Sequence, residues 1–179
     1  MIRDIKIPPL LIQLIDSGIS GIDGRVFENA PGCPECGGRL ISHDFKKKKF
    51  ASGIRREKIT PVYVRVKRFR CRECRKLVYA DSPFYPGIRA GAPVVDFCLV
   101  NCERYSYNHI SRILRHLHIY VSPSSVANYA SADIRTPHAV EMHRIFFPAS
   151  LLNLANVGFP EDFNTEIPTI MHIMPNRSF

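Results

Sequence analysis

The sequence contains no tryptophan, no long apolar run and few acidic side chains to balance its basic ones. A membrane-spanning helix needs roughly 18 or more consecutive apolar residues, and no such stretch is present. The short apolar run from Pro8 to Ile15 lacks a small-residue cleavage site and follows Asp4, so we expect no signal peptide. These absences exclude a membrane-spanning protein and predict a cytoplasmic one.

The missing tryptophan goes together with 14 prolines among 179 residues, a composition that favours several small units over one large core. The apolar fraction of 45 % is nevertheless too high for a disordered chain. We therefore expect a folded α+β protein made of small modules.

Basic residues outnumber acidic ones by 25 to 16, which gives a formal net charge of +9 and a pI near 9.5. Such a protein is expected to bind a polyanion, namely DNA, RNA or an acidic membrane surface. The charge is concentrated in one stretch, which Asp44, Glu57 and Glu73 alone oppose. Its members are Lys46, Lys47, Lys48, Lys49, Arg55, Arg56, Lys58, Arg65, Lys67, Arg68, Arg70, Arg72, Arg75 and Lys76. Because strand-like and cysteine-bearing segments interrupt the run, we interpret it as a binding surface rather than an ordinary solvated face.

Two CxxC pairs, Cys33 with Cys36 and Cys71 with Cys74, predict a zinc site. In a reducing compartment such pairs are typical of metal ligands rather than disulfides. Each pair can direct both sulfurs at one ion, and two pairs complete a tetrahedral four-thiolate shell. A closed shell leaves no position for a water, so we expect one structural zinc ion without catalysis at the metal. The alternative is a set of unligated or redox-active cysteines.

The residues that follow the two pairs differ in backbone freedom. Gly37 suits the left-handed turn after the first pair, whereas Arg75 makes the matching turn after the second pair less favourable. Cys98 and Cys102 are four residues apart among apolar neighbours, so we interpret them as small buried hydrophobes. We interpret the nearby histidines as surface or phosphate-facing groups: His109, His116 and His118.

Strand patterns lie between and after the cysteine pairs. Segments 39–42 and 61–70 are predicted strands, and the second alternates, with Val62, Val64 and Val66 on one face. The lysines of 46–49, followed by Ser52-Gly53, predict an exposed loop between these strands. Segment 77–80 is a third short predicted strand.

Beyond Pro93 the apolar spacing becomes helical and predicts a helix-turn-helix. One helix begins near Pro93, a second covers about 107–117, and a third begins at Ser122-Pro123, a typical cap and first-turn pair. Ile110, Ile113 and Leu114 are expected to pack on Val126 and Tyr129. A plain three-helix core is an equally good interpretation of this spacing alone.

The last helix would leave Ser124, Ser125 and Asn128 outward, where Asn can pair with adenine and Ser can contact phosphate or base edges. Arg112 and Arg115 would face the DNA backbone. The predicted DNA-binding residues are therefore Lys46, Lys47, Lys48, Lys49, Arg65, Lys67, Arg68, Arg70, Arg112, Arg115, Ser124, Ser125 and Asn128.

The predicted organisation has five parts. They are an N-terminal helix (about 8–16) and loop over 1–29, a four-thiolate zinc ribbon of short antiparallel strands over 30–82, a linker over 83–92, a three-helix helix-turn-helix domain over 93–133 and an irregular C-terminal tail over 134–179.

The order of these motifs resembles the N-terminal region of prokaryotic insertion-sequence transposases, in which a zinc ribbon and a helix-turn-helix precede a DDE catalytic domain. The resemblance covers roughly 30–132. It rests on Cys33-Pro34-Glu35-Cys36-Gly37-Gly38, on Arg68-Phe69-Arg70-Cys71-Arg72-Glu73-Cys74, on Ser82-Pro83-Phe84-Tyr85 and on Ile119-Tyr120-Val121-Ser122-Pro123-Ser124-Ser125-Val126. One departure is His118, where such turns often have glycine.

The resemblance implies a module that binds transposon-end inverted repeats as double-stranded DNA, in the nucleoid-associated cytoplasm of a prokaryotic cell. It leaves a homodimer open, and we expect neither a membrane partner nor a small-molecule substrate. Two other interpretations stay open on the sequence alone. One is a zinc-ribbon and helix-turn-helix transcriptional regulator, and the other is an RNA-binding or protein-interaction ribbon whose helices only pack.

In that family an acidic triad holds two magnesium ions for strand cleavage and transfer. We expect no such activity and no catalytic residue here, because the stretch after residue 132 is too short for an RNase H-like sheet. Its acids lie close together amid prolines: Asp133, Glu141, Glu161, Asp162 and Glu166. We therefore interpret the chain as a truncated or frameshifted transposase, or as a separately encoded DNA-binding half.

Overall fold

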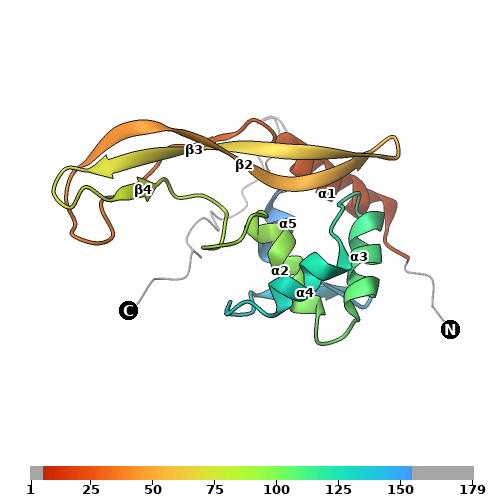
Figure 1. Ribbon diagram of the computed structural model, residues 1–179. Helices are drawn as coiled ribbons and strands as arrows, with labels where there is room; N and C mark the ends of the chain where they lie inside the picture. Colours follow the sequence, from red (N-terminus) through yellow and green to blue (C-terminus); the bar gives the residue numbers. More distant parts are fainter. Residues whose placement is uncertain (1–5, 155–179) are drawn as a thin grey trace, which may run out of the picture.

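The computed structural model describes residues 6–154 (Figure 1). In chain order its elements are α1 (Pro9–Gly21), β1 (Val26–Phe27), β2 (Leu40–Arg55), β3 (Lys58–Cys71), β4 (Leu77–Tyr79), α2 (Ala92–Asn101), α3 (Tyr107–His116), α4 (Pro123–Ala130), β5 (Ala139–Met142), β6 (Ile145–Pro148) and α5 (Ala149–Leu154). This mixture of helices and small sheets confirms the predicted α+β class.

A long antiparallel hairpin of β2 and β3 is the most extended feature of the molecule (Figure 1). The strands pair from Leu40 opposite Cys71 to Arg55 opposite Lys58. Between them, Arg56 and Glu57 have φ angles of 46° and 63°. Two consecutive left-handed residues are what a two-residue hairpin turn of type I′ requires.

The predicted exposed loop at 46–49 is wrong, because these lysines belong to β2. Lys46 lies opposite Val66 and Lys48 lies opposite Val64. Pairing with a strand of buried valines holds the lysines extended, although lysine has little intrinsic preference for strands. Gly53 is likewise buried within the strand rather than in a turn.

The rest of this sheet forms on β3. β1 pairs with it in parallel, with Val26 opposite Arg65, and β4 pairs antiparallel, with Phe69 opposite Val78. The predicted alternation in β3 is confirmed, since Val62, Val64 and Val66 are buried. The predicted third strand at 77–80 is confirmed as β4 to within one residue.

One hydrophobic core joins the hairpin to the helices. Phe50 of β2 and Val64 of β3 share it with Phe97 of α2 and Leu114 of α3, all of them fully buried. The boundary predicted between a ribbon module at 30–82 and a helical module at 93–133 therefore does not separate two cores. The hairpin end near its turn packs with the helices, and the opposite end extends beyond them (Figure 1).

Backbone hydrogen bonds attach the turn between α3 and α4 to the edge of β2. Gly53 forms a bridge with Ile119, and the Tyr120 N–H donates to the Ser52 carbonyl at 2.7 Å. Because β2 is at the edge of its sheet, these bonds satisfy backbone groups that would otherwise be exposed.

The helices begin close to the predicted positions. Ser122 caps α4 as expected, and its hydroxyl accepts a hydrogen bond from the Ser125 N–H at 3.2 Å. At the N-terminus, α1 runs five residues past the predicted end at 16, to Gly21. Its last turns pack Gly18 and Ile19 into the core, and this burial stabilises a helix that the glycines alone disfavour.

The predicted linker at 83–92 is a packed connection. Phe84 bridges to Gly91, and the Phe84 ring meets the Phe50 ring edge-on with centroids 6.0 Å apart. The Gly91 N–H donates to the Phe50 carbonyl at 2.8 Å, and a Cβ at position 91 would lie only 2.4 Å from the Phe50 ring.

The prediction of an irregular tail from residue 134 is wrong for 139–154, where β5 and β6 form a hairpin followed by α5. The buried side chains of Phe147 and Leu151 complete the core against α2. The Asn101 side chain fixes this hairpin by donating to the Phe146 carbonyl at 2.8 Å and accepting from its N–H at 3.1 Å. The remainder of the predicted tail, including Glu161, lies outside the described residues.

Over residues 6–154, none of the helices combines the length and apolar character that crossing a membrane requires.

Candidate metal centre and nucleic-acid interface

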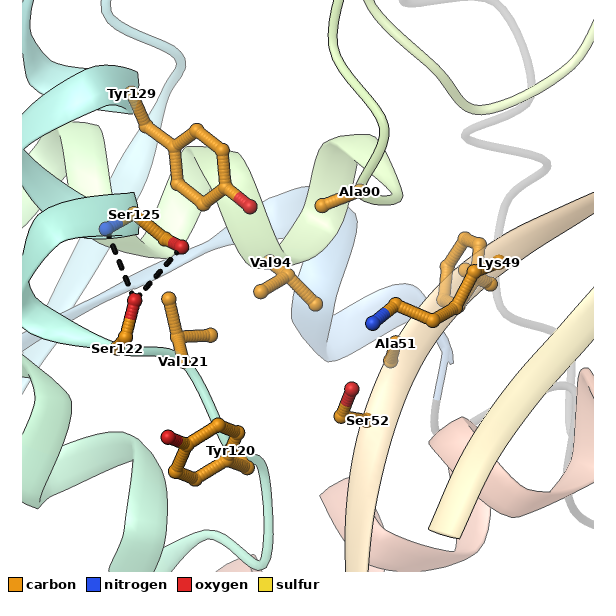
Figure 2. Close-up of a pocket in the computed structure, with 11 residues that line it drawn as sticks. Lys49, Ala51, Ser52, Ala90, Val94, Tyr120, Val121, Ser122, Ser125 and Tyr129 are labelled. Atoms are coloured by element: carbon orange, nitrogen blue, oxygen red, sulfur yellow. Dashed lines mark hydrogen bonds between the residues drawn. The ribbon is translucent and has the colours of Figure 1, made fainter. Parts of the chain in front are cut away.

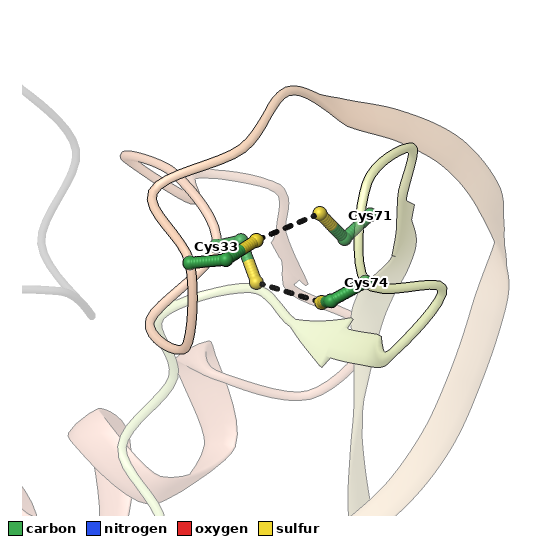
Figure 3. Close-up of side chains that lie close together, drawn as sticks. Cys33, Cys71 and Cys74 are labelled. Atoms are coloured by element: carbon green, nitrogen blue, oxygen red, sulfur yellow. Dashed lines mark hydrogen bonds between the residues drawn. The ribbon is translucent and has the colours of Figure 1, made fainter.

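The four predicted zinc ligands gather at the hairpin end that is remote from its turn, and Figure 3 labels three of them, Cys33, Cys71 and Cys74. The Sγ atoms of Cys33, Cys36, Cys71 and Cys74 all lie within 4.8 Å of one another. The separations from Cys33 to Cys74 and from Cys36 to Cys71 are 3.5 Å. A tetrahedral zinc ion with Zn–S bonds of about 2.3 Å places its sulfurs roughly 3.8 Å apart. The donor set and its spacing therefore fit a structural four-thiolate metal site.

Each cysteine pair sits in a tight turn closed by backbone hydrogen bonds. The Gly37 N–H donates to the Cys33 carbonyl at 2.9 Å, and the Cys71 N–H donates to the Lys76 carbonyl at 2.9 Å. Gly37 and Arg75 both adopt the left-handed conformation, with φ angles of 68° and 63°. Both turns require this conformation, which glycine adopts without the steric cost of a Cβ and arginine does not.

The apolar cluster around the cysteines is small and separate from the main core. Cys33, Cys71 and Val78 are its buried members, and Leu40 and Phe69 pack beside them. Because this cluster has few side chains, it buries little apolar surface. A bound metal ion would therefore supply much of the local stability.

The four thiols differ in acidity, because the pKa is lowered at Cys33 and raised at Cys36, Cys71 and Cys74. A backbone hydrogen bond from Glu35 is the main cause that lowers the pKa of Cys33 to about 7. The four exposed basic residues around the second pair lie where they can offset the negative charge of four thiolates on a dication: Arg70, Arg72, Arg75 and Lys76. One of them already forms an ion pair, because the Lys76 ammonium lies 2.8 Å from the Glu35 carboxylate.

The basic residues predicted to meet DNA lie on two faces of the hairpin. Residues directly opposite each other in an antiparallel pair share a face. We call the face away from the buried valines the outer face, and its members are Phe45, Lys47, Lys49, Tyr63, Arg65, Lys67 and Phe69.

On the outer face, cations and aromatic rings alternate across the strands. The Lys47 ammonium lies 4.1 Å from the centre of the Tyr63 ring, and the Arg65 guanidinium lies 4.7 Å from that of Phe45. The Lys67 ammonium lies 5.5 Å from the ring centre of Phe45 and 5.5 Å from that of Phe69. The rings hold the long side chains in place while leaving their charge without a carboxylate partner.

The opposite face carries Lys46, Lys48 and Arg68, which are less free than predicted. Arg68 forms an ion pair with Asp44, and hydrogen bonding from this guanidinium lowers the pKa of the Asp44 carboxyl. Lys48 lies over the Phe84 ring at 3.8 Å, and burial lowers its pKa. Lys46 lies over Tyr79, whereas Arg70 is exposed.

The candidate residues of α3 and α4 are partly placed as predicted. Arg112, Ser124 and Asn128 are exposed, and so is Arg115, whose guanidinium lies 5.7 Å from the Tyr120 ring centre. The prediction for Ser125 is wrong, because its side chain is half-buried and lines a cavity next to β2. Neighbouring helical positions differ by about 100° of rotation, and here that rotation turns Ser125 toward β2 while Ser124 stays exposed.

The histidines and the remaining cysteines occupy distinct environments. Cys98 is fully buried and Cys102 is half-buried, as predicted for small hydrophobes. His109 stacks on Tyr105 at 4.8 Å, and burial lowers its pKa. His116 is exposed. His118 takes the left-handed conformation with φ of 59°, at the turn position where the resembled family often has glycine.

The sequence interpretation missed a buried polar group in α2. The Asp96 carboxylate is only 3 % exposed and accepts hydrogen bonds from the Tyr85 hydroxyl at 2.6 Å and the Ser150 hydroxyl at 2.5 Å. The available signal was an acid inside an otherwise apolar run from Pro93 to Val100. The Asp96 contacts join the 83–92 connection, α2 and α5.

Comparisons with protein-family models, with curated proteins and with solved structures return no match to this chain.

Proposed function

We propose that this chain binds double-stranded DNA, as the DNA-binding portion of an insertion-sequence transposase that recognises the ends of its element. The sequence resemblance supplies the class of target, and the surface chemistry supports binding to a polyanion. In this proposal the chain contributes recognition, and the chemistry of strand cleavage and transfer belongs elsewhere.

The observation that carries the proposal is the uncompensated charge of the outer face. Among residues 6–154, carboxylates form ion pairs with Arg68, Lys76 and Arg104, but with none of Lys47, Arg65 and Lys67. Cations that lack a carboxylate partner are available to neutralise phosphates and release counterions, which produces binding that weakens steeply with salt.

Specificity in this proposal comes from α4, in the manner of a helix-turn-helix. Its exposed Asn128 and Ser124 are suited to base edges or phosphates in a major groove. The bonds from β2 to the turn before α4 hold this helix in a fixed position relative to the hairpin. Phosphate contacts by the hairpin would thereby set the register in which α4 meets the bases.

The metal's part in this function is structural. One zinc ion held by Cys33, Cys36, Cys71 and Cys74 would order the hairpin end that extends beyond the helices. Four thiolates leave no open coordination position, so the site offers no place for a substrate.

A second candidate function is binding of single-stranded RNA, which the aromatic rings of the outer face favour. Phe45 is 37 % exposed, and rings of this kind can stack on unpaired bases. The transcriptional-regulator interpretation shares every contact of the main proposal and differs only in its target sequence.

The deciding experiment measures binding of the zinc-loaded protein to duplex DNA and to single-stranded RNA of equal length over a salt series. A strong chelator is added in a parallel series. Preference for the duplex, a steep salt dependence and loss on chelation support the proposal. Preference for the single strand favours the second candidate, and binding to neither overturns both.

A further inference from the structure

A small cavity lies between the edge of β2 and the N-terminal part of α4, with a volume of about 130 Å³ (Figure 2). Lys49 and Ser52 of β2 line one side, and Ser122, Ser125 and Tyr129 line the other. The cavity is therefore built from two segments that are far apart in the sequence and that the backbone bonds at 118–120 hold together.

The cavity wall offers one ammonium and several hydroxyl groups but no carboxylate. Figure 2 shows the Lys49 ammonium and the Tyr129 hydroxyl pointing into the space between the two segments. A β-bulge between Lys49 and Ala51 re-aims the strand here, which allows a side chain from the strand edge to reach the cavity. Lys49 takes part in none of the salt bridges found within residues 6–154.

The placement of the Ser52 side chain points to a ligand in the cavity. Its residue is only 9 % exposed, and its hydroxyl faces the cavity (Figure 2). Among the described residues, no side-chain hydrogen bond involves this hydroxyl, although its backbone carbonyl is bonded to Tyr120. The Ser52 hydroxyl therefore opens on the cavity from a residue that is otherwise buried, and it can donate to a group that enters there.

The positive end of α4 adds to this character. The helix begins at Pro123, directly after Ser122, so the partial positive charge of its N-terminus lies beside the cavity. The hydroxyls of Ser122 and Ser125 are 2.9 Å apart there. An ammonium and several hydroxyls without a carboxylate among them suit a compact anion with several acceptor oxygens, and a phosphate group has that chemistry.

We propose that the cavity between β2 and α4 binds a phosphate group, with Lys49 as its counter-charge and with Ser52, Ser125 and Tyr129 as hydroxyl donors. This inference rests on the proposed function, which makes a nucleic acid the source of the phosphate group. A nucleic acid presents phosphates as backbone diesters and as terminal monoesters. The phosphate would fix the hairpin and α4 to one point on the bound strand.

The test follows the backbone amide signals of the full-length, zinc-loaded protein by NMR as inorganic phosphate is added at constant ionic strength. We expect saturable shifts at Ser52 and Ser125, and a dissociation constant that rises about tenfold or more in Lys49→Met and in Ser52→Ala. Lys47→Met is the matched control, because it removes the same charge from the outer face and should leave the phosphate titration unchanged.

A second arm uses duplex DNA with either 5′-hydroxyl or 5′-phosphate ends. Shifts at Ser52 with both duplexes identify a backbone diester, shifts with the 5′-phosphate alone identify a terminal monoester, and shifts with inorganic phosphate alone identify a free anion. The inference is overturned when neither phosphate nor DNA shifts Ser52, or when Lys47→Met weakens phosphate binding as much as Lys49→Met does. DNA binding that persists in that case leaves the proposed function standing.

Discussion

The backbone N–H of Ile54 donates a hydrogen bond of 2.7 Å to the carbonyl oxygen of His118. This bond joins the hairpin near its turn to the connection between α3 and α4, at a residue that adopts a left-handed conformation. The hairpin and the helices therefore form one packed unit, and the predictions below distinguish the parts of that unit that the metal, the charges and the core each control.

Replacing Cys71 by Ser should abolish metal binding and unfold the hairpin end that carries β4, while the helices stay folded. The reason is that the cysteine cluster is separate from the main core, so its loss leaves Phe97 and Leu114 packed. Zinc content by atomic absorption and amide hydrogen exchange measure the two effects. Cys102→Ser is the control and should keep one zinc per chain. Full zinc content in Cys71→Ser would rule out the assigned ligand set.

Single substitutions at the two left-handed turn positions, 37 and 75, should change the free energy of unfolding in opposite directions. Arg75→Gly relieves a backbone cost and should stabilise the zinc-loaded protein by roughly 0.5–1 kcal/mol, and Gly37→Ala should destabilise it by about 1 kcal/mol. No atom lies within 4 Å of a Cβ built at Gly37, so the cost there is one of backbone conformation alone. Guanidinium unfolding of each variant measures the change, and effects of equal sign would contradict the explanation.

Removing a cation of the outer face should reduce the salt dependence of DNA binding. Lys47→Ala is expected to lower the slope of log affinity against log salt by about 0.9 for one lost phosphate contact. Arg68→Ala is the contrast, because its guanidinium is already paired with Asp44. It should change the slope much less. An equal loss in both variants would mean that the two faces of the hairpin contact DNA alike.

Asn128→Ala should weaken discrimination between DNA sequences more than it weakens binding to bulk DNA. A side chain that pairs with a base contributes about 1–3 kcal/mol of discrimination, whereas phosphate contacts are indifferent to sequence. Affinity for a selected site against mixed competitor DNA measures the ratio. Asn108→Ala, at an exposed position of α3, is the control and should leave that ratio unchanged.

The buried carboxyl of Asp96 should make folding stability depend on pH. Burial raises its pKa above the ordinary value of 3.8 for Asp. Since the folded state then binds the proton more tightly than the unfolded state, this group's stabilising contribution is complete below the unfolded pKa and is lost as pH rises through the folded pKa. Asp96→Asn should remove that dependence, which denaturant unfolding at a series of pH values measures. An unchanged pH profile in the variant would assign the dependence to other groups.

Features set by local chemistry could be predicted from the sequence. The cysteine spacing identified the four clustered thiols, the alternation of Val62, Val64 and Val66 identified a strand, and Ser122-Pro123 identified the start of α4. In each case a few neighbouring residues carry the whole signal.

Features that depend on distant partners could not be predicted. The lysines of β2 are extended because Val64 and Val66 lie opposite them, and the turn falls at Arg56-Glu57 because that register buries Phe50. The hairpin of β5 and β6 is stabilised by the Asn101 side chain, 45 residues from its partner Phe146. No short window of sequence contains both members of such pairs.

The length of β2 sets the size of the contact that one molecule can make. Gly53 is attached to the α3–α4 turn, and Leu40 begins the end that carries the cysteines. At about 3.3 Å per residue, the strand between them covers roughly 40 Å, which exceeds the roughly 34 Å of one turn of B-form DNA. A single chain that contacts DNA along its whole hairpin would therefore leave a nuclease footprint longer than one helical turn, without any second copy.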